Sequence, residues 1–313
     1  IVEVENESTM AVAVAFDRSD ILTERPIANV PIEGIDLPVG SFVLPLAHTA
    51  VVRVAVPHGA GDSGALATSS TTALQVVRGW QQLTERASRF VLPDGERGAT
   101  LAEAVTAERC EIALGTLATA QDDPAGFALA LGELVRMGEQ PDHWVPELVD
   151  AVAALGPTPG WDADVALEAA RRVLDAAGER RALRDLRRIV GRRAEPAGRP
   201  PEPPRGVRSV AWLESSFARG GALLPDGVPT AWLGQSFEVY GVPTEAGSAV
   251  SFAVRWHGER PAVLWEQSGE AVELSAPMLA PDWRSSEVKG ETLWPVPPGA
   301  DPRPAATEPG SFS

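Results

Sequence analysis

The sequence predicts a multidomain α+β protein with an N-terminal antiparallel β region, a central antiparallel bundle of about six helices and a C-terminal antiparallel β-sandwich. Three observations support this prediction. Apolar residues alternate with a period of two over residues 1–57, recur every three or four positions over residues 73–193, and alternate again after residue 208. A proline-rich connector, residues 194–207, separates the second part from the third. A strongly patterned hairpin over residues 249–266 marks the centre of the last part.

Residues 1–60 make up the predicted N-terminal β region. Two hairpins are expected, one over residues 1–16 and one over residues 41–56, each turning at a short polar cluster. Isolated hairpins are only marginally stable, so this region is expected to pack against further structure, either as its own domain or as half of a joint sandwich. Residues 61–72 are predicted to be a linker, because small and polar residues dominate them.

Residues 73–193 carry the helical period. Thr72 is the expected N-cap of a first helix whose apolar pattern continues to Val91. Further helices are expected over residues 100–117, 124–137, 144–155, 161–177 and 179–189. Asp123 followed by Pro124 is typical of an N-cap and a first helical residue. The glycines expected to end helices in the left-handed conformation are Gly138, Gly156, Gly178 and Gly191.

The C-terminal sandwich is expected over residues 208–294. Strands are predicted at residues 209–213, 231–233, 236–240 and 271–274, beside the hairpin over residues 249–266. In that hairpin Phe252, Val254 and Trp256 occupy alternate positions, which is the pattern of a half-buried strand. Residues 295–313 are rich in proline and predict a disordered or loosely draped tail.

Composition excludes several classes of function. The formal net charge of −16 over 313 residues argues against nucleic-acid binding, because a phosphate backbone would be repelled. No segment approaches the roughly 18 consecutive apolar residues of a membrane span. Cys110 is the single cysteine, so an intrachain disulfide and a cysteine-cluster zinc site are excluded. No metal or cofactor is predicted.

The likely compartment and source follow from the same composition as expectations. With one cysteine, a reducing, cytoplasmic location is expected, and secretion is the alternative if a signal peptide was removed before Ile1. Arginine supplies all but one of the 27 basic residues, the exception being Lys289. This bias is typical of a GC-rich bacterial genome.

Tryptophan is concentrated in the C-terminal region, at positions 212, 232, 256, 265, 283 and 294. Trp256 and Trp265 fall in the alternating pattern of the hairpin and are expected in the core. Trp232, at the start of a short strand, and Trp283, in a loop context, are the predicted ligand-binding platforms, because an indole face can stack on a sugar ring. The alternative interpretation is that these large side chains fill a small core.

Arg255, His257 and Glu259 are the other predicted ligand-binding residues. A turn that projects these three side chains could hold a polar ligand; the alternative is a solvated turn with weak ion pairs. Catalytic residues stay unassigned, since the sequence singles out no pair among the carboxylates of the helical region. Those carboxylates are Glu133, Glu139, Asp142, Glu147, Asp150, Asp162 and Asp164. Asp162 and Asp164 are typical of helix caps and dipole partners.

Residues 79–90 and 123–134 resemble helices of the six-hairpin (α/α-toroid) glycosidases, and the order of β region, helices and β region is similar to parts of those enzymes and their β-sandwich accessory domains. That family has twelve toroid helices, whereas about six are expected here. The catalytic acid and base of the family have no counterpart in this chain, so no residue role is carried over. The resemblance implies a carbohydrate-related role.

Three functions remain as hypotheses. The first is a carbohydrate-associated binding or accessory protein, with a glycan or sugar ligand on the tryptophan-rich sandwich. The second is a glycoside hydrolase of unfamiliar type that uses carboxylates of the helical region. The third is a structural or assembly protein that acts through sheet edges, the proline-rich tail or the arginine-rich helices between Arg171 and Arg193, the last of which could bind a protein partner. A solvated, ion-paired helix face is the alternative interpretation of that arginine run.

Overall fold

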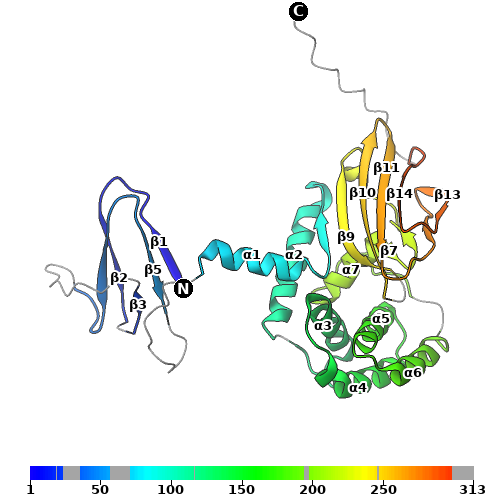
Figure 1. Ribbon diagram of the computed structural model, residues 1–313, viewed down its shortest axis with the longest axis horizontal. Coiled ribbons are helices and arrows are strands. Elements are labelled where there is room, and N and C mark those ends of the chain that lie inside the picture. Colours follow the sequence, from blue (N-terminus) through cyan, green and yellow to red (C-terminus); the bar gives the residue numbers. More distant parts are fainter. Residues whose placement is uncertain are drawn as a thin grey trace, which may run out of the picture. The chain divides into compact units, whose positions relative to one another are not determined.

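The computed structural model describes residues 1–18, 20–23, 36–56, 71–115, 117–193, 197–244 and 247–297. The chain divides into two compact units, Ile1–Gly79 and Trp80–Ser313, which are described separately (Figure 1). In the described part of the chain no helix has the length and apolar character needed to cross a membrane. The architecture is mixed α+β, with seven α-helices and several antiparallel sheets among the described residues.

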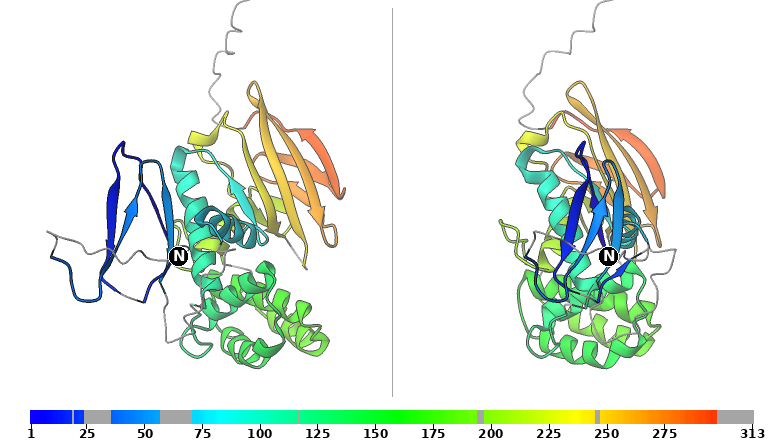
Figure 2. Two further views of the ribbon diagram at one scale, coloured as in Figure 1. Left: turned by 60° about the vertical axis from the view of Figure 1, so that its left-hand side comes forward. Right: turned by 90° about the vertical axis from the view of Figure 1, so that its left-hand side faces the viewer.

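The first unit contains five short strands, β1 (Val2–Glu5), β2 (Val12–Phe16), β3 (Leu22–Thr23), β4 (Phe42–Leu46) and β5 (Val51–Ala55). The expected local hairpins are wrong, because β1 pairs with β5 and β2 pairs with β4, all antiparallel (Figure 2). The buried side chain of Asn6 explains this pairing. Its Nδ2 donates to the carbonyl oxygens of Met10, Leu46 and Ala47 and so ties the first turn to the 46–50 turn.

Helix α1 (Ala73–Thr84) begins where the sequence predicts. The amide of Gln75 donates to Oγ1 of Thr72 at 3.2 Å, and the amide of Thr72 donates to Oε1 of Gln75 at 2.8 Å, which is a reciprocal capping box. The predicted continuation to Val91 is wrong. Residues Arg89–Val91 form strand β6, which pairs with a strand from the C-terminal part of the chain.

The five other predicted helices are confirmed. They are α2 (Gly98–Ala113), α3 (Pro124–Met137), α4 (Val145–Leu155), α5 (Trp161–Ala176) and α6 (Arg180–Val190). Asp123 caps α3, because its Oδ1 accepts from the amide of Gly126 at 2.9 Å. Gly138 and Gly178 have the expected positive φ, whereas Gly156 and Gly191 are right-handed.

Helices α3 to α6 share one apolar core at one end of the second unit (Figure 1). Ala128 and Leu131 of α3 and Ala166 and Ala170 of α5 are fully buried where the two helices pack. Gly132 lies in the same contact, where a Cβ would approach that of Ala169 to 3.0 Å. The small residues of both helices therefore allow a close approach.

Two of the predicted C-terminal strands are wrong. Residues 209–213 lie in helix α7 (Arg208–Phe217), and residues 231–233 include a turn of 3-10 helix, Thr230–Trp232. Val210, Leu213 and Phe217 follow helical spacing and are all buried, and a short apolar run does not distinguish a strand from a helix. Residues 197–207 of the predicted connector contain neither helix nor strand.

The central hairpin is confirmed. Strands β10 (Ala249–His257) and β11 (Arg260–Ser268) pair antiparallel, and His257 lies opposite Arg260 at the turn. They belong to a five-stranded sheet of order β14-β11-β10-β9-β6. The other strands are β9 (Phe237–Pro243) and β14 (Lys289–Leu293).

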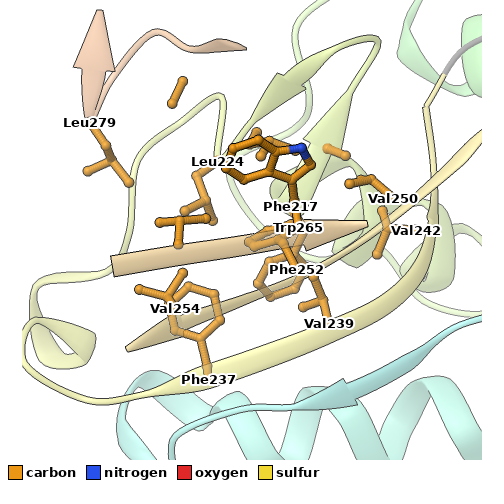
Figure 3. Close-up of a cluster of buried hydrophobic side chains, with 14 of the residues drawn as sticks. Phe217, Leu224, Phe237, Val239, Val242, Val250, Phe252, Val254, Trp265 and Leu279 are labelled. Atoms are coloured by element: carbon orange, nitrogen blue, oxygen red, sulfur yellow. The ribbon is translucent and has the colours of Figure 1, made fainter. Parts of the chain in front are cut away.

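A second sheet has the order β13-β12-β8-β7, with β7 (Ala218–Arg219), β8 (Ala222–Leu223), β12 (Leu274–Ala276) and β13 (Ala280–Ser285). Residues from both sheets and from α7 enter one core, in which Phe217, Phe237, Phe252 and Trp265 contribute large side chains (Figure 3). Trp265 is buried as predicted, and Trp256 is partly buried against the same core. Most of the predicted tail, from residue 298 onward, and residues 61–70 of the predicted linker lie outside the described residues.

Candidate functional site

The two tryptophans predicted to be sugar platforms lie in different surroundings. Trp232 is only 4% exposed, its ring stacks on that of Phe217, and its Nε1 donates to the carbonyl oxygen of Gly95. The prediction of an open Trp232 platform is therefore corrected, because protein covers the indole. Trp283 lies in β13 rather than in a loop, is half-buried, and contacts the rings of Trp265 and Trp294 edge-on.

The predicted polar turn is exposed. Arg255, His257 and Glu259 lie at or beside the tip of the central hairpin, and Arg255 donates to the carboxylate of Glu238 on the neighbouring strand. The hydroxyl of Tyr240 donates to the same carboxylate, and together with Arg255 it lowers the pKa of Glu238. Neither of the two cavities described below is lined by the three predicted residues.

A cavity of about 340 Å³, called the Trp212 pocket here, lies beside α7. Its apolar wall consists of Leu101, Trp212, Phe217, Leu224, Val228 and Trp232. Arg199, Ser216 and Asp226 add polar groups to the lining. Its volume falls near the lower end of the range for small-molecule sites, and its mixture of apolar wall and few polar groups is typical of them.

Local structure explains how the pocket forms. Trp212 and Ser216 are four residues apart in α7 and thus share one helix face. Nε1 of Trp212 donates to the carbonyl oxygen of Pro200 at 2.8 Å, which holds the connector against the helix. The amide of Leu224 donates to the carbonyl oxygen of Phe217, and Gly227, with φ +83°, closes the turn that presents Asp226.

Three charged side chains meet at the pocket. The guanidinium of Arg199 lies 4.1 Å from the ring centre of Trp212 and donates through Nε and Nη2 to Oδ2 of Asp226, at 3.1 and 2.9 Å. Nη2 of Arg219 donates to the same carboxylate at 3.1 Å. Nη1 of Arg199 is buried and has no hydrogen-bond partner. The arrangement can bind a ligand that presents an apolar face and hydrogen-bonding oxygens.

A second cavity of about 440 Å³ lies between the end of α1, strand β6 and helix α2. Glu85, Arg89 and Glu103 line it, and Ser88 and Arg109 connect it to a buried charge cluster. The guanidinium of Arg89 is stacked on Tyr240, 4.1 Å from the ring centre.

The buried charge cluster comprises Arg109, Glu133, Arg136 and Glu214, each almost fully shielded from solvent. Nε of Arg109 donates to Glu133 at 2.7 Å, and Nη1 of Arg136 donates to Glu133 at 2.6 Å and to Glu214 at 2.7 Å. Burial alone would raise the pKa of Glu133, but the charges of Arg136 and Arg109 outweigh it and lower the pKa to about 2. Glu133 is therefore ionised at neutral pH and cannot act as a general acid there.

Two other carboxylates of the helical region are also held by arginines. Oδ2 of Asp162 accepts from Arg208 at 2.8 Å, and Oδ1 of Asp164 accepts from Arg193 at 2.7 Å. Cys110 is half-buried, and burial raises the pKa of its thiol, which makes it a poor nucleophile. Within the described ranges no group of three or more His, Cys, Asp and Glu side chains could hold a metal ion.

Sequence reasoning missed the Trp212 pocket. Arg199 and Asp226 are 27 positions apart, in a segment interpreted as a connector and in a loop, and no spacing rule links them. The buried charge cluster did leave a signal, because Glu133 and Arg136 interrupt the apolar run of α3. Comparison with protein families, curated proteins and solved structures finds no match to this chain.

Proposed function

We propose that this chain is a carbohydrate-associated binding protein whose ligand site is the Trp212 pocket. The observation that carries the proposal is the meeting of an indole wall, from Trp212 and the edge of Trp232, with the Arg199–Asp226 pair in one cavity. Sugars combine apolar C–H faces with hydroxyl groups, so they need both kinds of surface. The proposal agrees with the role implied by the resemblance to six-hairpin glycosidases.

Binding is favoured over glycoside hydrolysis. Hydrolysis needs two carboxyl groups roughly 5–10 Å apart. Asp226 is the one carboxylate among the described residues that line the Trp212 pocket, and it is paired with Arg199 and Arg219. As part of the same proposal, the five-stranded and four-stranded sheets constitute a β-sandwich, and helices α3 to α6 a bundle.

Calorimetric titration of the full chain with a panel of mono- and disaccharides tests the function. Trp212→Leu is expected to weaken binding at least tenfold, because the indole wall is lost, whereas Trp283→Leu is expected to leave affinity within about twofold. Trp283 is the matched control, since it is also half-buried but lies outside the pocket. The reverse result would move the site to Trp283, and the absence of binding to any sugar would overturn the proposal.

A second candidate function is docking to an acidic protein segment through α6. Arg180, Arg181, Arg184, Arg187 and Arg188 are exposed on this helix, and of these Arg188 pairs with Asp185 at 3.2 Å. The chain as a whole carries a charge of −16, so α6 is a local basic surface that a short acidic segment could reach without contacting the acidic remainder.

Fluorescence anisotropy with a labelled polyglutamate peptide tests this second function. Binding that is lost in Arg184→Glu/Arg187→Glu supports it. Binding to a DNA duplex with equal or higher affinity, or no loss in the double variant, would contradict it.

A further inference from the structure

We infer that the Trp212 pocket takes a sugar that carries a carboxylate, a uronate, and that Nη1 of Arg199 donates to that carboxylate. This inference rests on the proposed function and adds the class of ligand. It starts from an unused hydrogen-bond donor in the pocket lining.

Arg199 uses only part of its hydrogen-bonding capacity. Its Nε and Nη2 both donate to Asp226, while Nη1 is buried without a partner, on a side chain that is 14% exposed. A buried guanidinium N–H without a partner is costly, so an orphan of this kind marks a place where a further acceptor fits. Arg199 lines the cavity, so the ligand can supply that acceptor.

The local charge selects an anionic acceptor. Arg199 and Arg219 share the single carboxylate of Asp226, which leaves one positive charge in excess in this group of three. A neutral hydroxyl would satisfy the orphan donor but leave that charge uncompensated. A carboxylate does both, and charge-assisted hydrogen bonds to guanidinium groups are the stronger kind.

The size and donor count of the site distinguish between anions. A cavity of about 340 Å³ suits a single sugar ring rather than an oligosaccharide. A phosphate ester carries close to two charges and three strong acceptor oxygens, whereas the group offers one excess charge and one free nitrogen donor. These features favour a uronate over a sugar phosphate.

Calorimetry on the full chain with four probes tests the inference: glucuronate, glucose, glucose 6-phosphate and acetate. Glucuronate is expected to bind at least tenfold more tightly than glucose, and more tightly than the phosphate ester or acetate. Equal affinity for glucose and glucuronate would overturn the inference and leave the proposed function in place. Tighter binding of the phosphate ester, or of acetate, would overturn the uronate assignment. The failure of all sugars would overturn the proposed function itself.

Two variants locate the contact. Arg199→Met is expected to reduce the preference for glucuronate over glucose to within about twofold, because it removes the orphan donor. Arg219→Met removes the same charge from the Asp226 group but does not line the cavity, so it is expected to retain most of the preference. Equal losses in both variants would show that only long-range charge acts and would overturn the direct contact. If Arg199→Met fails to fold, as judged by circular dichroism, the four-probe comparison on the native chain decides.

Discussion

Glu214 accepts hydrogen bonds from three side chains in the interior of the second unit, those of Ser88, Arg109 and Arg136. These partners come from β6, α2 and α3, whereas Glu214 itself is on α7. Removing one member of a buried ion cluster costs far more than the interaction contributes in an exposed pair, because the remaining charges are left without compensation.

Glu214→Ala is therefore expected to lower the free energy of unfolding by about 3–5 kcal/mol, measured by urea denaturation followed by tryptophan fluorescence. Asp185→Ala is the control, because its pair with Arg188 is exposed on α6 and is expected to contribute at most about 1 kcal/mol. A similar effect of both substitutions would contradict the distinction between the buried cluster and the surface pair.

The depressed pKa of Glu133 predicts how stability responds to acid. Its pKa falls from 4.5 to about 2 on folding, so its stabilising contribution is complete above about pH 4.5 and is lost as the pH falls toward 2. Glu133→Gln is expected to destabilise the chain less, relative to the native chain, at about pH 3 than at about pH 6. Urea midpoints at the two pH values check this, and a pH-independent difference would show that Glu133 is not the titrating group.

Sequence reasoning at the residue scale worked where the interaction is local. Thr72 and Asp123 cap their helices as predicted, because the partners lie three residues away. Trp232 was misjudged, since its burial depends on Phe217 and Gly95, which are distant in the chain. Nothing in the sequence near Trp232 reports those contacts.

At the scale of elements, Gly221 shows how closely β8 approaches β12. A Cβ at Gly221 would lie 2.0 Å from the carbonyl oxygen of Glu273, and the amide of Ser275 donates to the carbonyl oxygen of Gly221 at 2.9 Å. The backbones are thus in direct contact, and the four-stranded sheet depends on a residue without a side chain at this point.

Gly221→Ala is expected to destabilise the chain by about 1–3 kcal/mol, because the backbone must shift. Gly79→Ala has the same chemistry at a helical position of α1 with nothing within 4 Å, and is expected to stabilise by about 0.5–1 kcal/mol. Thermal unfolding of both variants checks the pair. Two shifts of the same sign would contradict the assigned environments.

Helices were predicted better than sheets for a physical reason. The hydrogen bonds of α3 and α5 run within ten to twenty consecutive residues, so caps and periodicity are enough to find them. The pairing of β1 with β5 joins residues about fifty positions apart and depends on Asn6, and no periodicity encodes this. The strand predicted at residues 209–213 failed because its few apolar residues fit both periods.

At the scale of the whole molecule, the two units have separate interiors. The large apolar cores consist of residues from the second unit, whereas Leu46 and Val54 are buried in the first. All nine tryptophans, from Trp80 to Trp294, belong to the second unit, so intrinsic fluorescence reports on that unit.

A fragment of residues 71–297, which keeps α1 whole, is therefore expected to fold alone and to show the same fluorescence-detected urea midpoint and slope as the full chain. Comparative denaturation of the two proteins checks this. A lower midpoint in the fragment would mean that the first unit stabilises the second.

The charge cluster around Glu133 and Glu214 has a consequence for how this chain can diverge. Arg172, whose pKa is lowered chiefly by burial, lies near both glutamates and pairs with Glu168 at 3.7 Å, so three arginines balance three glutamates. Loss of a single member strands an opposite charge, while exchange of an Arg–Glu couple for apolar residues of similar volume is tolerated. In descendants of this sequence, these positions should therefore mutate in oppositely charged couples, so that the pattern of joint replacement would identify the fold even after the surrounding residues have drifted.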